Sequence, residues 1–410
     1  MKKVIYNTAA FYIIRIILML SPIVVLPLLS RLLNHDDFAY YLFLISLGTW
    51  MSLIVEFGFV ISGTRAIASN KNEITFIQNK LKIVNNSKLF LSFILLCFAI
   101  GFYFISNNLI YLLAWLYAVL LGLNFTWFFQ GLQKVKVLLV AELASTLLFI
   151  LSILAIFFLS GTLIWVIFSL LFTRMLNLIV CYLYVKHNFS TKGMQVSLLN
   201  ILHEIKSASS AFFLVSFVSL YTSFNVVFLG IMATGVQLIY FAGSEKIVRA
   251  GCSLLAPISQ AFLPEMSIRF KNDIYQAFRI FKWMLMIVTL LGIGMHIFVI
   301  LFAKWFILIL LGNQYIEAVS ILNVLSAILP AVAFSSVLSM HFLMPFGKEA
   351  ICAKIYLISG IINVLLAVIF VSRFGAMALA FSVVICEYVV AILMLCVAYN
   401  LKRKLFKRMI

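Results

Sequence analysis

The sequence predicts an all-α, polytopic membrane protein, with about 12 transmembrane helices in two six-helix bundles and both termini in the cytoplasm. Of its 410 residues, 65% are hydrophobic and only 10% are charged. Soluble domains are about half apolar and about a quarter charged, so this composition indicates lipid as the solvent. The apolar residues lie in runs of the roughly 20 residues that a membrane helix needs. Most of the basic residues lie between those runs.

The first half of the chain contains six apolar runs. An acidic loop at Asp36 and Asp37 separates the first two runs, and a basic loop at 64–86 separates the second from the third. Short turns at 106–108 and 160–162 follow the third and fifth runs. The predicted helices cover about residues 8–31, 38–63, 87–106, 109–131, 138–160 and 163–185, each long enough to cross a bilayer.

The second half repeats this organisation after the basic segment 186–206. Two stretches, 207–231 and 283–303, contain no Asp, Glu, Lys or Arg. The turns at 233–235 and 372–375 are short, and a basic loop covers 263–281. The predicted helices cover about residues 208–231, 236–262, 283–303, 318–346, 352–371 and 376–400.

The basic residues predict the orientation in the membrane. Of the 30 Lys and Arg residues, 23 lie in one alternate set of loops, and only Arg31, Lys304 and Arg373 lie in the opposite set. Positive charge marks cytoplasmic loops, so both termini are expected in the cytoplasm. The first large cytoplasmic group consists of Arg65, Lys71, Lys80, Lys82 and Lys88. The net charge of +18 is therefore explained as a topology signal, and no nucleic-acid partner is expected.

The chain divides at the basic segment into an N-terminal six-helix bundle at 1–190, a cytoplasmic linker at 191–206 and a C-terminal six-helix bundle at 207–410. Loops on the external side are too short for a soluble domain. Whatever the protein does, it is expected to do within the bilayer.

Charged residues inside the spans are the candidate functional residues, because a charge at the bilayer centre costs about 2.5–3.5 kcal/mol on insertion scales. Arg174 is near the middle of its helix, about 16 Å from either end. Lys246 and Arg249 are three residues apart and share one helix face. Arg15 is nearer a helix end, and Arg31 and Arg65 lie at helix ends, where an interfacial anchoring role is the alternative.

Four acidic residues, Glu56, Glu142, Glu245 and Glu387, are the candidate ion-coupling groups. Glu245 is four residues before Arg249, so the two side chains could pair on the helix surface. Glu387 has no cation close in sequence. It is either a site that binds and releases a proton during transport or the partner of a cation from another helix.

The sequence contains no motif of an enzyme. GxSxG, HExxH, P-loop and Rossmann glycine patterns are absent. The six cysteines lie in apolar stretches without a CxxC pair, which argues against a metal site. We expect no catalytic residue, no metal and no cofactor.

Residues 26–68 contain a recognisable pattern. It reads Leu26-Pro27-Leu28-Leu29-Ser30-Arg31, then Phe38-Ala39-Tyr40-Tyr41, Val55-Glu56-Phe57-Gly58-Phe59 and Gly63-Thr64-Arg65. This resembles the N-terminus of the Wzx-type O-antigen flippases, which belong to the superfamily of multidrug/oligosaccharidyl-lipid/polysaccharide exporters and lipid II flippases. Ala39 departs from the family, which often has glycine there. Length and helix number agree over the whole chain.

The resemblance implies a V-shaped, cation-lined cavity between two six-helix bundles in the bacterial inner membrane. It also implies a substrate of undecaprenyl diphosphate with one oligosaccharide repeat unit, moved from the cytoplasmic to the periplasmic leaflet by alternating access. Arginine binds phosphate oxygens in a forked geometry, so the intramembrane cations fit a diphosphate. Partners from the same pathway would be a polymerase and a chain-length regulator.

Three other functions are compatible with parts of this pattern. A multidrug or metabolite exporter of the same superfamily would favour an acidic cavity for cationic substrates. A polysaccharide polymerase or ligase would need a large external loop for catalysis. A membrane scaffold would not need charges at the centres of its helices.

Overall fold

The computed structural model describes residues 21–189, 195–233, 235–272 and 274–407, and within these ranges the secondary structure is helical, without strands. The chain divides into two compact units, residues 1–219 and 220–410. The all-α, polytopic fold class is thereby confirmed. Eight helices among the described residues are long and apolar enough to cross a membrane. Arg15 lies outside the described residues.

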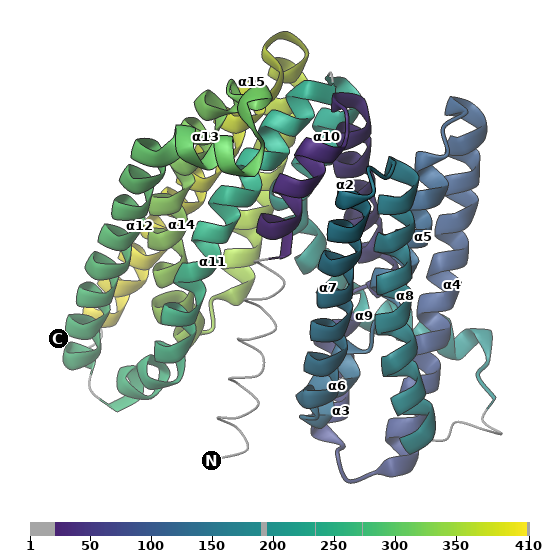
Figure 1. Cartoon of the computed structure of the whole chain (residues 1–410). Helices are drawn as coiled ribbons and strands as arrows, with labels where there is room; N and C mark the ends of the chain where they lie inside the picture. The colour runs from purple at the N-terminus through teal and green to yellow at the C-terminus, as the bar shows by residue number, and fades with distance from the viewer. Residues whose placement is uncertain (1–20, 190–194, 234, 273, 408–410) are drawn as a thin grey trace. The chain divides into compact units, whose positions relative to one another are not determined.

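The described part of unit 1 starts with the helix Ser21–Leu32. The side chain of Asn34 then caps α2 by accepting a hydrogen bond from the backbone N–H of Asp37 at 2.8 Å. Figure 1 shows the succession of helices that follows. They are α2 (His35–Glu56), α3 (Phe59–Ser69), α4 (Ile74–Ser106), α5 (Ile110–Gly122), α6 (Thr126–Leu132), α7 (Val135–Phe158), α8 (Leu163–Asn188) and α9 (Leu198–Thr222).

Two of the predicted spans in unit 1 are each interrupted. The span predicted at 38–63 consists of α2 and α3, separated by Phe57 and Gly58, which have φ of 46° and 71°. The span predicted at 109–131 consists of α5 and α6, separated at residues 123–125. The predicted linker 191–206 contains the first part of α9. Apolar runs alone do not reveal such interruptions, because the residues on both sides stay hydrophobic.

The core of unit 1 is built on the short helices that follow these interruptions. Helix α2 packs against α5, and α3 packs against α6. Trp127, Phe128 and Phe129 of α6 are fully buried. Gly63 of α3 faces Trp127 so closely that a Cβ atom there would lie 2.6 Å from the indole ring. The aromatic core therefore depends on a residue without a side chain at this position.

Unit 2 contains helices α10 (Phe224–Met232), α11 (Gly235–Asn272), α12 (Ile274–Leu310), α13 (Ala318–Ser326), α14 (Ile328–Leu338) and α15 (Glu349–Lys407), with 3-10 helices at Asn313–Tyr315 and Met344–Phe346. A π-helix, Ser339–Leu343, follows α14. The core of unit 2 is formed by α11, α12, α14 and α15, around Phe281, Phe342 and Met394. Non-helical dihedrals at Gly375 divide α15 into two helices, which correspond to the last two predicted spans.

One correction concerns the third predicted span, which was expected to begin at about residue 87. Helix α4 begins at Ile74, so Lys80, Lys82 and Lys88 are helical and do not lie in a loop. Lys88 is fully buried. Its Nζ donates hydrogen bonds to the backbone carbonyl oxygens of Gly122 at 2.8 Å and Asn124 at 2.9 Å. The ammonium group thus satisfies carbonyls that the interruption between α5 and α6 leaves without helical partners.

Arg65 is also placed differently from the expectation. It was assigned to the end of a span next to a loop, but it lies inside α3, within the candidate membrane span His35–Ser69. The side chain is exposed. Arg65 lies in the second half of α3 because a new helix begins after Gly58 and continues to Ser69.

We predict that Gly58→Ala destabilises the protein by about 1–3 kcal/mol, because Gly58 adopts a left-handed conformation that alanine rarely adopts. A Cβ atom would also lie 2.6 Å from the backbone nitrogen of Phe212. Thermal unfolding of the detergent-purified protein measures the effect. Gly101→Ala is the matched control, because a Cβ atom there meets no atom within 4 Å. Equal melting temperatures for both variants would contradict the prediction.

We also predict that Lys88→Met lowers stability by about 1–3 kcal/mol for each carbonyl that loses its donor. Lys136→Met removes an exposed lysine and serves as the control. The melting temperature should fall for the first variant and stay within error for the second. An unchanged melting temperature for Lys88→Met would mean that the two carbonyls do not depend on the ammonium group.

Candidate functional site

Most of the predicted site residues belong to two charged groups on transmembrane helices. One group lies in unit 1, on α7 and α8, and the other lies in unit 2, on α11 and α15. In both groups an arginine lies beside at least one carboxylate. An opposite charge nearby lowers the free energy cost of burying the arginine in hydrocarbon.

The unit 1 pair consists of Arg174 from α8 and Glu142 from α7, two helices that lie side by side (Figure 1). The Nη1 atom of Arg174 is 3.5 Å from Oε2 of Glu142. The same carboxylate oxygen accepts no hydrogen bond from the described residues, although it is buried. Hydrogen bonds between ionised groups are about 2.7–2.9 Å long. The pair is therefore an ionic contact that does not use the full bonding capacity of either group.

Neutral polar side chains continue this part of the interface between α7 and α8. Asn177, one turn after Arg174, donates a hydrogen bond to Oγ of Ser145 at 3.2 Å. Ser152 and Ser169 form a further hydrogen bond between the two helices. From α2, the hydroxyl group of Tyr41 lies within electrostatic range of Arg174. This side of unit 1 thus presents a polar stripe between α7 and α8.

The unit 2 group consists of Glu245, Lys246 and Arg249 from α11 and Glu387 from α15. The Nε atom of Arg249 is 3.5 Å from Oε1 of Glu245, one turn earlier on the same helix. The Nη1 atom of Arg249 is 3.8 Å from Oε1 of Glu387. Arg249 therefore bridges two carboxylates. The partner of Glu387 is a cation from another helix, which is one of the two alternatives that the sequence left open.

Lys246 is partly buried and interacts electrostatically with Glu245. It forms no ion pair within 4.0 Å among the residues that the structure describes. The side chain of Arg249 is 29% exposed, whereas that of Glu387 is only 5% exposed. The two cations of this group are thus more accessible than the acid that Arg249 contacts on α15.

The remaining acid, Glu56, interacts electrostatically with Lys88. Sequence reasoning missed Lys88, because it was counted among the loop charges. The signal was present in the spacing: Lys88 continues a stripe of buried positions on α4 that comprises Ile77, Leu81, Val84, Lys88, Leu91 and Leu95. A lysine on the buried stripe of a helix is expected to be inside the bundle.

Two other predicted cations, Arg31 and Arg65, lie on helices other than those that carry the two groups. The Nη1 atom of Arg31 donates a hydrogen bond to the carbonyl oxygen of Pro27 at 2.7 Å and is exposed. Arg65 is exposed on α3. Within the described ranges, no group of three His, Cys, Asp or Glu side chains is placed to hold a metal ion.

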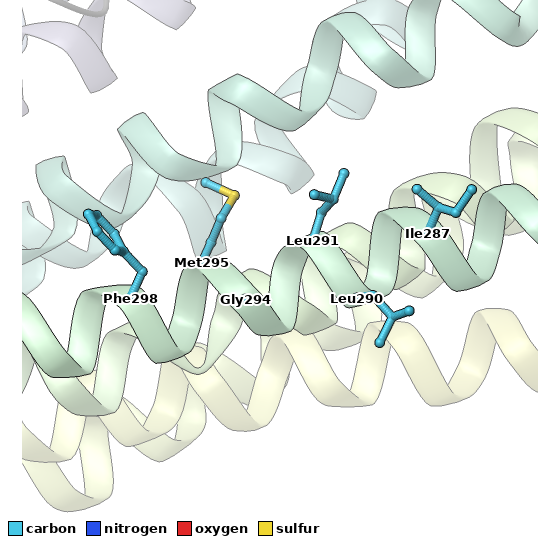
Figure 2. A pocket seen from close by; sticks show the side chains of 6 residues that line it. All are labelled: Ile287, Leu290, Leu291, Gly294, Met295 and Phe298. Atoms are coloured by element: carbon cyan, nitrogen blue, oxygen red, sulfur yellow. The ribbon is translucent and has the colours of Figure 1, made fainter.

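A separate groove of about 460 Å³ lies on α12 and has no charged lining. Figure 2 shows Ile287, Leu291, Met295 and Phe298 along it, with Leu290 pointing to the other side and Gly294 leaving a gap in the row of side chains. Ile287, Leu290 and Phe298 are exposed. This is a surface suited to hydrocarbon, and it provides no group for recognising a polar substrate.

Each charged group has as many carboxylates as cations. Its net charge is therefore zero when every member is ionised. The arrangement can nevertheless bind an anion if the anion replaces a carboxylate as the partner of an arginine. It can equally bind a cation through the released carboxylates. The geometry is thus a set of long ion pairs on membrane helices.

Comparison with known structures places this fold among transporters. The chain is similar to an inward-facing multidrug resistance transporter of the MATE family in the MOP superfamily, with a TM-score of 0.76, 14% identity and coverage of 95% of this chain and 96% of the other. It is also similar to the lipid II flippase MurJ in an inward closed conformation, with a TM-score of 0.70, 14% identity and coverage of 97% and 87%. These similarities concern the fold.

Two relatives are similar in sequence over nearly their whole length. Both are named "Putative O-antigen transporter". The protein from Shigella dysenteriae is 28% identical over 384 residues, with coverage of 92% of this chain and 95% of the relative. The protein from Escherichia coli K12 is 24% identical over 389 residues, with coverage of 93% and 94%. The model of the polysaccharide biosynthesis protein family matches residues 1–270. The chain is therefore a multi-pass membrane protein that belongs to the polysaccharide biosynthesis protein family.

Proposed function

We propose that this protein is a flippase that moves undecaprenyl-diphosphate-linked oligosaccharide units from the cytoplasmic to the periplasmic leaflet of the bacterial inner membrane by alternating access. The observation that carries the proposal is the position of Arg174 and Arg249 in long ion pairs on membrane helices. The names of the two sequence relatives support the class of substrate. We infer that the two six-helix bundles carry one group each and that both termini are cytoplasmic.

The proposed binding step is an exchange of ion-pair partners. A diphosphate presents oxygen atoms that match the planar fork of arginine better than a carboxylate at 3.5 or 3.8 Å does. The diphosphate would therefore displace Glu142 from Arg174, or Glu245 and Glu387 from Arg249. Lys246 adds a further positive charge beside Arg249 and can approach a phosphate as a point charge. The lipid tail stays in hydrocarbon while only the head group crosses.

This exchange would allow the acidic residues to couple substrate binding to proton uptake. A carboxylate that loses its arginine inside the bundle is left without a counter-charge, and protonation then becomes the less costly state. Binding of the anionic head would thus favour uptake of a proton by Glu142, Glu245 or Glu387, and its release would favour loss of that proton. Glu56, beside Lys88, is the fourth candidate. Protons are the coupling ion that we propose.

Transport of cationic drugs is the second candidate, because one similar structure is a multidrug transporter. In the same ion pairs, the carboxylates could leave the arginines and contact a cationic substrate. The two functions differ in which member of each pair contacts the substrate, so exchanging the two charges separates them. A polymerase or ligase activity is not proposed, since the longest external loops contain few residues. A polymerase and a chain-length regulator remain the proposed partners.

We predict that Arg174→Glu and Arg249→Glu each abolish surface polysaccharide in a flippase-null bacterial strain. The substitution brings a negative charge to the point where the diphosphate is proposed to bind. Surface polysaccharide measured by gel electrophoresis reports the effect. Lys136→Glu, on an exposed site of α7, is the control and should restore normal amounts. Normal polysaccharide from both arginine variants would remove these residues from the mechanism.

We predict further that the double variant Arg174→Glu/Glu142→Arg recovers folding but not transport. It keeps an ion pair between α7 and α8 with the positive charge moved to the other helix. Membrane abundance and melting temperature should return toward those of the native protein, while polysaccharide stays absent. If the double variant restored polysaccharide, the pair would be structural and the exchange of partners would be excluded there.

A further inference from the structure

A polar cavity lies in unit 1, away from the charged pair. It has a volume of about 830 Å³ and is lined by residues of α4 and α8 together with Phe189. Its polar lining consists of Lys82, Asn85, Asn86, Lys186 and His187. Lys186 is 12 residues after Arg174 on α8, which corresponds to about 18 Å along the helix. The cavity is therefore separate from the Glu142–Arg174 pair.

The lining residues occupy one face of each helix. On α4, the residues at 81, 82, 85, 86 and 89 recur at helical spacing, and on α8 the residues at 182, 183, 186 and 187 do the same. Helix α5 packs against both α4 and α8. The cavity lies near the first turns of α4 and the last turns of α8, at the ends that carry the basic residues.

The charges in this cavity favour an anion. Two lysines, one imidazole and two carboxamides provide hydrogen-bond donors, and no acidic residue belongs to the lining. Glu204, which lies close to α4, is bound to Lys80 at 2.6 Å and has its charge compensated. Lys186 lies over the ring of Tyr182 at 6.0 Å, which holds its stem along α8. This set of donors fits the oxygen atoms of a phosphate diester.

The apolar part of the lining indicates that the phosphate belongs to a lipid. Leu89 is 52% exposed and Leu183 is 55% exposed, and they lie one to two turns deeper along their helices than Lys82 and Lys186. Such side chains on membrane helices contact acyl chains, while lysines near a helix end reach the head-group region. A soluble phosphate would gain nothing from this apolar wall.

We propose that the cavity between α4 and α8 binds an anionic phospholipid, with its phosphate at Lys82 and Lys186 and an acyl chain along Leu89 and Leu183. Basic pockets between membrane helices on the cytoplasmic side bind anionic head groups in this way. The proposal does not depend on the transported substrate. It adds a structural or regulatory lipid site to unit 1, on helices that also carry Arg174 and Lys88.

The test measures lipid binding to the full chain by native mass spectrometry in detergent. Phosphatidylglycerol, phosphatidylethanolamine and inorganic phosphate are titrated separately. We expect phosphatidylglycerol to bind at least tenfold more tightly than phosphatidylethanolamine. Lys82→Gln/Lys186→Gln should weaken phosphatidylglycerol binding by about 30-fold, since each lysine near the head groups contributes ~1 kcal/mol. The melting temperature verifies that this variant is folded.

The matched control is Lys71→Gln/Lys136→Gln, which removes the same charge from two exposed lysines outside the cavity. It should bind phosphatidylglycerol within about twofold of the native protein. Equal losses in both double variants would attribute binding to general surface charge and overturn the site. Displacement of phosphatidylglycerol by millimolar inorganic phosphate would assign the cavity to a soluble anion and overturn the lipid.

Discussion

Pairing of charges inside a hydrocarbon environment is the constraint on which this structure depends. An isolated charge at the centre of a membrane helix is costly, and the cost falls when an opposite charge or several carbonyl groups surround it. Arg174, Arg249 and Lys88 each meet this requirement differently, through one carboxylate, two carboxylates and two backbone carbonyls. The arrangement of Arg174 and Glu142 leaves bonding capacity for a ligand. The buried contact of Lys88 holds the fold together instead.

The interrupted helices are the second feature with consequences for function. The interruption at Phe57 and Gly58, the break between α13 and α14 and the π-helix at Ser339–Leu343 all lie within predicted spans, whereas Gly375 lies in the predicted turn between the last two spans. π-Helical segments are often found at functional sites. The proposed alternating access needs helices that can bend, and helices bend most readily where their hydrogen-bond pattern is interrupted. We propose that these positions act as joints during the transport cycle.

The sequence predicted the membrane fold and most charged positions, because long apolar runs and charges within them are local signals. Glu245 and Arg249 could be paired by their spacing on one helix. Glu142 with Arg174, and Arg249 with Glu387, could not be paired, since their contacts depend on which helices become neighbours. Lys88 was assigned to a loop because the first half of α4 contains many polar residues, and only its second half is a long apolar run. The left-handed residues Phe57 and Gly58 lie in a continuous hydrophobic run, and such a run predicts one uninterrupted helix.

Transport by the purified protein in liposomes tests the central claim most directly. A fluorescent undecaprenyl-diphosphate oligosaccharide is placed in one leaflet, and its appearance in the other leaflet is followed by accessibility to a sugar-cleaving enzyme, in parallel with uptake of a cationic dye. The account predicts protein-dependent movement of the diphosphate lipid, slowed strongly by an excess of a second polyprenyl diphosphate, and no movement of the dye. Uptake of the dye without movement of the diphosphate lipid would contradict it.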